Sequence, residues 1–155
     1  MNLLCDLLQF FSAGLLGLFV GALLAEGALF IPYWRALPAK QFFALHKVHG
    51  PRLYRFFAPL TVAATMSAVV TAVACALADH PGRWPALAAG ILSASMVGLY
   101  FLYFKRANAS FAAASLSADE LSTELNLWAE WHWARVVIGV AAFVAALLGL
   151  TMRQI

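Results

Sequence analysis

Charged residues are scarce in this 155-residue chain: Asp, Glu, Lys and Arg together make up 11% of it, whereas a soluble domain contains about 25%. Hydrophobic residues make up 64% of the chain, and the formal net charge is only +3. This composition excludes an ordinary soluble domain and indicates an integral membrane protein. The sequence also has no basic cluster with interleaved aromatic residues, so nucleic acid is not an expected partner.

Cysteine is equally scarce. Cys5 and Cys75 lie in or beside apolar segments and form no CxxC motif, so we predict two small buried hydrophobic side chains. The N-terminal stretch MNLLCDLLQFF lacks the basic start and the small-residue cleavage site of a signal peptide. Its apolar run continues well beyond the length of a signal sequence, and we therefore expect a retained helix.

The sequence contains four long apolar segments. The predicted spans cover about residues 7–31, 55–78, 84–104 and 133–152, and a helix needs about 20 residues to cross a bilayer. The sequence DHPGR at 79–83 predicts a tight turn between the second and third spans. Short connections predict an all-α, up-down four-helix bundle. We treat residues 1–155 as a single transmembrane domain with cytoplasmic helical extensions, the fourth span ending before Arg153.

Several local signals predict where the helices begin and end. Pro32 is expected to end the first helix, and Gly50-Pro51 to end a short helix that begins at Pro38. Ser117 followed by Glu120 predicts a capping box at the start of a long helix that continues into the fourth span. Small residues in the first helix are expected to face a neighbouring helix, with Leu, Phe and Val toward lipid: Ala13, Gly14, Gly17, Gly21, Ala25 and Ala28.

Basic residues are concentrated in two connections. The connection between the first and second spans carries five, and the connection between the third and fourth spans, together with the start of the fourth, carries three. These are eight of the ten Lys and Arg residues in the chain: Arg35, Lys40, Lys47, Arg52, Arg55, Lys105, Arg106 and Arg135. Positive charge favours the cytoplasmic side. We therefore predict a protein of the inner (plasma) membrane of a bacterium, with both termini on the non-cytoplasmic side.

Glu26 is the one acidic residue deep within a predicted span. It lies about 7–8 Å inside the first helix's cytoplasmic end at 1.5 Å per residue, where a carboxylate costs a few kcal/mol. The carboxyl group is therefore expected to be protonated, bound to a metal, or paired with a cation. The candidate cations are Arg52, Arg55 and Arg135.

Three histidines fall at the same membrane level as Glu26. His46 and His49 lie in the first basic connection, and His132 begins the fourth span, whereas His80 is expected to be a solvated turn residue. Glu26, His46, His49 and His132 form a candidate metal set, because imidazole and carboxylate suit iron, copper or zinc. Haem ligation by one or two of these histidines is an alternative, and a third reading leaves them as interfacial residues without a cofactor.

The tryptophans support two readings. Trp34, Trp84, Trp128, Trp131 and Trp133 predict an aromatic belt at the membrane interface. Alternatively, some of them line an apolar pocket for a flat aromatic or quinone-like ligand. Tyrosines and amides supply the other candidate contacts of such a pocket: Tyr33, Tyr54, Tyr100, Tyr103, Asn108 and Asn126.

Several stretches resemble the anthrone oxygenase-like family, a group of small four-helix membrane proteins long catalogued as a domain of unknown function. The resemblance rests on GLFVGALLAEGALFIPYWRALP, FFALH, Arg52, Phe56-Phe57-Ala58-Pro59, Asn108 and WHWAR followed by AAF, and it covers nearly the whole chain. Fungal members oxidise an anthrone to an anthraquinone with dioxygen. The positions that the resemblance implies as a site are Glu26, Trp34, Asn108, Trp128, His132 and Arg135.

Two classes of function remain open at this point. The first is a membrane-embedded oxidoreductase for an aromatic, phenolic or quinone-like molecule. Its catalytic candidates are Glu26, His132 and Arg135, and its substrate-binding candidates are Trp34, Tyr100, Asn108 and Trp128. The second is a non-enzymatic subunit, or homo-oligomer, that stabilises a larger membrane complex. A small-molecule or proton carrier is the least supported, because no span is broken in the manner of transporter repeats.

Overall fold

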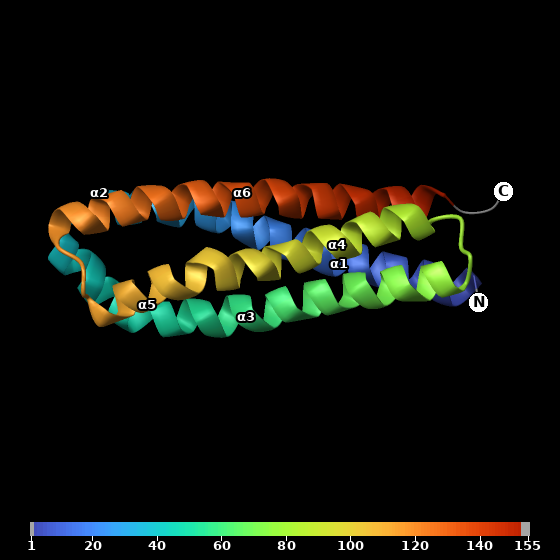
Figure 1. The fold of residues 1–155 in the computed structure, drawn as a ribbon, viewed down its shortest axis with the longest axis horizontal. Helices are drawn as coiled ribbons and strands as arrows, with labels where there is room; N and C mark the ends of the chain where they lie inside the picture. The colour runs from blue at the N-terminus through green and yellow to red at the C-terminus, as the bar shows by residue number, and fades with distance from the viewer. Residues whose placement is uncertain (1, 153–155) are drawn as a thin grey trace.

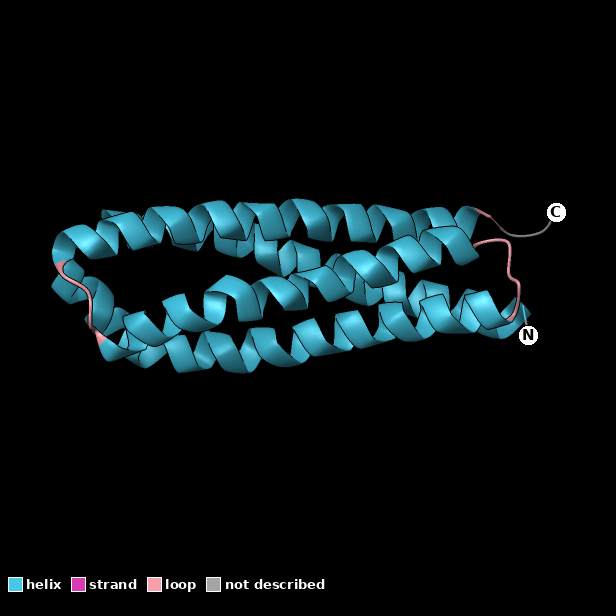
Figure 2. Cartoon of the chain, viewed as in Figure 1, coloured by secondary structure: helices cyan, strands magenta, loops and turns pink. Residues whose placement is uncertain are grey.

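The computed structural model describes residues 2–152, and these residues form helices and short turns without a strand (Figure 2). Eight helical elements stack into four rods, each long and apolar enough to cross a membrane. The elements are α1 (Asn2–Ala25), η1 (Glu26–Phe30), α2 (Ile31–Ala36), α3 (Ala39–Leu77), α4 (Arg83–Leu99), η2 (Tyr100–Phe104), α5 (Lys105–Ala113) and α6 (Ala118–Thr151). The predicted all-α four-helix bundle is confirmed; Arg153 lies outside the described residues.

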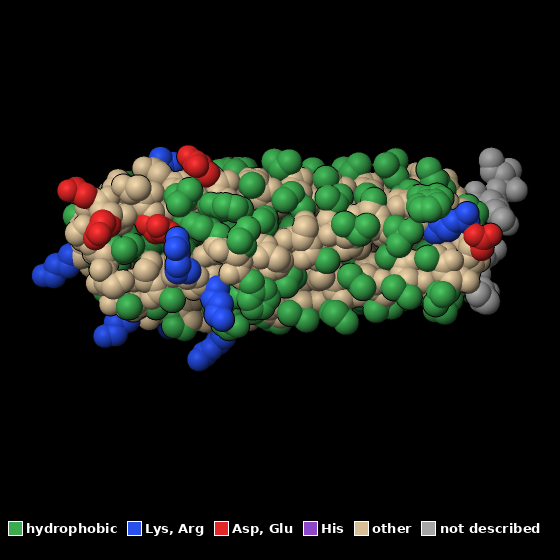
Figure 3. Space-filling view, viewed as in Figure 1, with side chains coloured by type: hydrophobic (Ala, Val, Ile, Leu, Met, Phe, Trp, Pro, Cys, Tyr) green, Lys and Arg blue, Asp and Glu red, His purple; other side chains and the backbone are tan. Residues whose placement is uncertain are grey.

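The rods run up and down, so the two ends of the bundle differ. Both termini and the turn at residues 78–82 lie at one end, which we call the terminal end (Figure 1). The opposite end holds the connections at residues 37–38 and 114–117. We call it the basic end, because exposed Lys and Arg side chains gather there (Figure 3): Arg35, Lys40, Lys47, Arg52, Arg55, Lys105 and Arg106.

The predicted start of the last rod is confirmed. The Ser117 hydroxyl accepts a hydrogen bond from the Glu120 N–H, and the Glu120 carboxylate accepts one from the Ser117 N–H at 2.8 Å. These two bonds satisfy donors that the first turn of a helix leaves without partners. From this cap, α6 continues without interruption to Thr151.

The prolines do not end helices where the sequence predicts. Pro32 lies in the first turn of α2, where its missing N–H is harmless, and the Ile31 N–H just before it donates to the Glu26 carbonyl across a widened turn. Pro51 and Pro59 both lie inside α3. A helix that continues through a proline loses about one backbone hydrogen bond, whereas a broken helix in lipid would leave several groups unsatisfied.

The predicted small-residue stripe of the first rod packs only in part inside the bundle. Ala13 is buried, and a Cβ atom at Gly17 would lie 3.0 Å from the Phe143 ring of α6. Gly14, Gly21, Ala25 and Ala28 are exposed, and large side chains fill the rest of the inward face: Leu16, Phe19, Val20 and Leu23. Glycines of other rods also make close approaches. A Cβ atom at Gly90 of α4 would lie 3.0 Å from the Ala72 Cβ of α3, and one at Gly139 of α6 would lie 3.1 Å from Val20.

The turn at the terminal end is more ordered than the sequence suggests. The prediction that His80 is solvated is wrong, because this side chain is 2% exposed. Its Nε2 lies 3.3 Å from the Asp6 carboxylate on α1, and its Nδ1 accepts a hydrogen bond from the Gly82 N–H at 3.1 Å. The turn is thereby attached to the first rod. Cys5 and Cys75 are buried free thiols nearby, as predicted.

The packing of α3 against α4 can be tested with a matched pair of glycines on α4. Gly90→Val places a side chain against Ala72 and the backbone of α3, whereas a Cβ at Gly98 meets nothing within 4 Å. Overpacking of this kind costs about 1–3 kcal/mol. We expect Gly90→Val to lower the unfolding temperature in detergent and Gly98→Val to leave it nearly unchanged. Equal effects of the two variants would contradict the packing described.

Candidate functional site

The candidate site begins at η1, where the first rod widens into a π-helical turn. Glu26 opens this turn and is 5% exposed, so its carboxylate is directed into the bundle. Gly27 follows and permits close contact with α6, because a Cβ there would lie 3.1 Å from the His132 ring and 3.1 Å from the Trp133 ring. Single π-helical turns within α-helices are frequent at functional sites.

Arg135 of α6 is the partner of Glu26. Its Nη2 lies 3.2 Å from the Glu26 Oε2, and its guanidinium lies over the Phe104 ring at 4.5 Å from the centroid. Both side chains of the pair are largely buried. A buried charge is stable only when it has a partner and hydrogen bonds. Of the cations considered from sequence, Arg135 is the one that pairs with Glu26; Arg52 and Arg55 are exposed.

His132 lies behind this pair and is fully buried. Its Nε2 is 2.9 Å from the Leu23 carbonyl oxygen, and because a carbonyl only accepts, this nitrogen carries the proton. Its Nδ1 then accepts from the Arg135 Nη2 at 3.0 Å. The hydrogen bonds thus assign a neutral Nε2–H imidazole. Both of its nitrogens are engaged, so His132 orients the Arg135 guanidinium.

Aromatic rings surround the polar group. Trp128 stacks on His132 with centroids 5.2 Å apart, and its indole N–H donates to the Asn108 side-chain oxygen at 3.1 Å. Trp34 meets the edge of Trp128 at 5.7 Å, and Phe104 meets Trp128 at 5.3 Å. These contacts join α2, η2, α5 and α6 into one wall. The orientation of the indole and of the amide is fixed by this wall.

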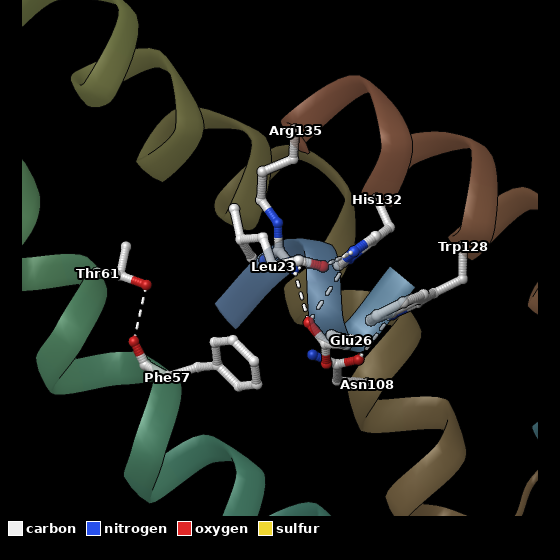
Figure 4. A network of polar contacts seen from close by, with 8 residues as sticks. All are labelled: Leu23, Glu26, Phe57, Thr61, Asn108, Trp128, His132 and Arg135. Atoms are coloured by element: carbon white, nitrogen blue, oxygen red, sulfur yellow. Dashed lines mark hydrogen bonds and ion pairs between the residues drawn. The ribbon is translucent and has the colours of Figure 1, made fainter. Parts of the chain in front are cut away.

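A cavity of about 670 Å³ opens in front of the wall. Glu26 and Arg135 line it, and so do all four predicted substrate-binding residues, Trp34, Tyr100, Asn108 and Trp128. Figure 4 shows Phe57, on the facing helix α3, pointing toward Glu26. The second widened turn, η2, begins at Tyr100 on the cavity wall. Most of the other lining side chains are apolar or aromatic.

The structure separates the remaining predicted candidates from this site. Trp84 is 67% exposed and Trp133 is 43% exposed, as expected of interface residues, and Asn126 is also exposed. Trp131 instead stacks on Tyr103 with centroids 5.3 Å apart. The aromatic residues therefore follow both readings of the sequence: some lie on the surface, and others form the cavity wall.

The predicted metal ligands are not brought together. His46 packs its ring against Phe42 and Phe111, His49 is exposed, and both nitrogens of His132 are already hydrogen-bonded. Within residues 2–152, no group of three His, Cys, Asp or Glu side chains is arranged to hold a metal ion. The proposed set of Glu26, His46, His49 and His132 does not assemble as a site for iron, copper or zinc. His46 does line the cavity described above, and its Nδ1 is buried without a hydrogen bond.

Two parts of the site were not identified from sequence. The widened turns η1 and η2 carry no recognisable sequence motif. The nearest indication of η1 is Glu26, an acidic residue within a predicted span shortly before Pro32. The role of Phe104 under Arg135 was also missed. An aromatic residue at the end of a span is ordinarily assigned to the interface belt, so its position in the sequence gave no reason to expect a cation above its ring.

Comparison of the chain with models of known families, with curated proteins and with solved structures found no match in any of the three. The chemistry of the site is therefore inferred from its own geometry.

A double-mutant cycle tests whether Glu26 and Arg135 act as a pair. Glu26→Leu leaves the Arg135 guanidinium buried without its counter-charge, and removing one partner of a buried pair costs about 3–5 kcal/mol. The double variant Glu26→Leu, Arg135→Met removes both charges, and we expect it to recover most of that loss. The measurement is reversible unfolding in detergent micelles. Additive effects of the two substitutions would show that the side chains do not interact.

Proposed function

We propose that the protein is a membrane-embedded oxidoreductase, oxygenase-like in its chemistry, that acts on an aromatic, phenolic or quinone-like small molecule. The observation that carries this proposal is the Glu26–Arg135 pair on the wall of an aromatic-lined cavity of about 670 Å³. Small-molecule sites commonly have about 300–1,000 Å³ and combine apolar walls with a few convergent polar groups. The resemblance to anthrone oxygenase-like proteins agrees with this class of substrate.

The walls suit a flat ring. Trp34, Trp128 and Phe104 are already held by their mutual edge contacts, so they offer rigid surfaces at little cost in side-chain entropy. Phe57 and Tyr100 extend the aromatic lining. Offset stacking and edge contacts between rings add about 0.5–1.5 kcal/mol each beyond the burial of area. A molecule without a ring would leave this part of the cavity poorly filled.

We assign a different role in the proposed reaction to each of the three polar residues Glu26, Arg135 and His132. Glu26 is the candidate general base, because its carboxylate faces the cavity. Arg135 is the candidate for stabilising a developing enolate or phenolate oxygen. The sequence offers His132 as a second candidate base, but its Nδ1 accepts a hydrogen bond from Arg135 and its Nε2–H donates to the Leu23 carbonyl. We therefore assign it the role of positioning the guanidinium.

The proposed reaction needs only dioxygen as a second substrate. Glu26 takes a proton from an activated CH₂ group that is conjugated through the ring system to a carbonyl, and Arg135 stabilises the resulting enolate oxygen. The enolate carbon is oxidised by dioxygen, and with the returned proton a hydroperoxide forms. Loss of water from the hydroperoxide leaves a carbonyl, so one oxygen atom is incorporated and the other leaves as water. No step is assigned to a metal, because the donors present do not assemble a site.

The membrane setting supports the same proposal. The site lies toward the basic end of the bundle, which the distribution of Lys and Arg predicts to be cytoplasmic. A hydrophobic substrate and dioxygen both dissolve in the hydrocarbon phase. We therefore propose that the reaction takes place within the inner membrane near its cytoplasmic surface.

One observation favours the second candidate function, a subunit of a larger membrane complex. The exposed residues Gly14, Gly21 and Ala25 of α1 and Ala28 of η1 follow one stripe of the first rod, and the bundle itself does not cover them. Stripes of small residues allow close packing with another membrane helix. On this reading Glu26 and Arg135 serve only to stabilise the fold, and substitution of the stripe, rather than of the pair, removes function.

Substitution of Glu26 tests the enzymatic proposal. Glu26→Gln keeps the size of the side chain but cannot accept the substrate proton, and loss of a general base lowers turnover by about 10²–10⁴-fold. The assay follows dioxygen uptake and ketone formation with an anthrone-type carbon acid in liposomes. Glu130→Gln is the matched control, because Glu130 is an exposed carboxylate on α6, and we expect it to retain activity. Wild-type protein that does not accelerate the reaction over empty liposomes would contradict the proposal.

A further inference from the structure

The outer rim of the cavity consists of side chains that are also exposed on the surface of the bundle. Tyr54 is 60% exposed, Val62 is 59% exposed and Phe101 is 65% exposed, yet all three line the cavity. Tyr54 and Val62 belong to α3, and Phe101 belongs to η2. An enclosed cavity would have buried lining residues throughout. The cavity is therefore a slot that opens sideways between α3 and the rod formed by α4, η2 and α5.

The inner part of this opening lies at a depth occupied by hydrocarbon. In α3 the sequence contains no charged residue from Phe56 to Leu77, and in the facing rod it contains none from Trp84 to Phe104. Val62, Val97 and Phe101 lie within these uncharged stretches. In Figure 3 the charged side chains on the visible face lie toward the two ends of the bundle, and hydrophobic side chains cover the region between them. The opening thus faces lipid tails.

The slot is longer than a single ring. Its lining on α3 extends from Phe42 to Val62, and 20 residues at 1.5 Å each correspond to about 30 Å. Phe19 and Met96 lie nearer the terminal end than Glu26 and Tyr100 do, because α1 runs away from that end and α4 begins there. Glu26 and Arg135 therefore face the slot part-way along its length, with a further section beyond them.

The section beyond the charged pair offers apolar contacts. Phe19, Ala58, Val62, Met96 and Val97 line it. The hydroxyl of Thr61, which also lines the slot, already donates to the Phe57 carbonyl at 2.8 Å. A polar chain would lose its hydrogen bonds to water there without replacement, whereas an apolar chain would exchange lipid contacts for protein contacts.

The charged pair retains an unused hydrogen-bonding group. The Arg135 Nε is buried and makes no hydrogen bond, although its Nη2 is engaged by Glu26 and His132. This nitrogen is covered by protein, so an oxygen atom on a bound ring would meet the part of the Arg135 side chain that lines the slot. The slot thus combines one position for a ring oxygen with an apolar section beside it.

We infer that the substrate is an oxygenated ring that carries an apolar chain, and that it enters from the bilayer between α3 and η2. The ring lies at Glu26 and Arg135, and the chain extends along Val62 and Val97. The position of the ring rests on the proposed function; the sideways opening and the chain do not. The competing route is from the aqueous side, past Lys47 and Ala112, which line the slot at the basic end.

Photolabelling of the full chain in lipid nanodiscs tests this inference. The probe is an alkylphenol with a diazirine at the end of its chain, and the labelled residues are located by mass spectrometry. We expect labels on residues 58–62 and 96–101. Val62→Trp should reduce this labelling at least tenfold by filling the opening. Val73→Trp is the matched control on the same helix, since Val73 is 52% exposed but does not line the cavity, and it should change labelling less than twofold.

A second probe separates the two proposals. It is a short phenol with the diazirine on the ring, and it should label residues around Trp34 and Asn108 in the wild type. If the ring probe labels these residues but the alkyl-chain probe labels only the region of Lys47 and Ala112, the lipid route is overturned and the proposed function stays intact. The lipid route would also be overturned if Val62→Trp did not reduce labelling by the alkyl-chain probe. Failure of the ring probe to label the cavity, with the chain probe still labelling residues 58–62, would overturn the proposed function and leave the lipid route intact.

Discussion

The ion pair between Glu26 and Arg135 is the interaction on which the arrangement of this protein depends. A carboxylate inside a membrane helix needs a compensating charge, and here the partner comes from the opposite end of the chain. The contact at 3.2 Å fixes η1 against α6 and holds the guanidinium over Phe104. Glu26 makes this contact from the first position of the widened turn η1. The first and last rods are thereby held in one register at the level of the cavity.

The remaining contacts of the site follow from this pair. His132 accepts from Arg135 and donates to the Leu23 carbonyl, so the imidazole couples the guanidinium to the backbone of α1. Trp128 stacks on the imidazole and orders Asn108 in turn. One face of this network is covered by protein, and the other borders the cavity. The network thus holds a polar group in a fixed position beside an apolar space, as the proposed stabilisation of an enolate oxygen needs.

The sequence predicted some of this arrangement and could not predict the rest. Hydropathy and the Ser117–Glu120 cap were sufficient for the four rods and for the start of α6, because both are local signals. The cost of burying Glu26 predicted that it is protonated, bound to a metal or paired with a cation, and Arg135 was one of three candidate cations. The tautomer of His132, the turns at η1 and η2, and the burial of His80 depend on contacts between distant segments. The packing face of the first rod was predicted only in part: Ala13 and Gly17 pack inside the bundle, whereas Gly14, Gly21, Ala25 and Ala28 do not.

Solid-state NMR in lipid bilayers tests the central pair most directly. Dipolar dephasing between ¹⁵N-labelled arginine side chains and ¹³C-labelled glutamate carboxyl carbons reports contacts of a few ångströms. Among residues 2–152, Glu26–Arg135 is the one Arg–Glu ion pair, so uniform labelling of the two residue types is sufficient. The structure predicts clear dephasing in the wild type and its loss in a Glu26→Gln sample. A wild-type spectrum without dephasing would show that the pair does not form.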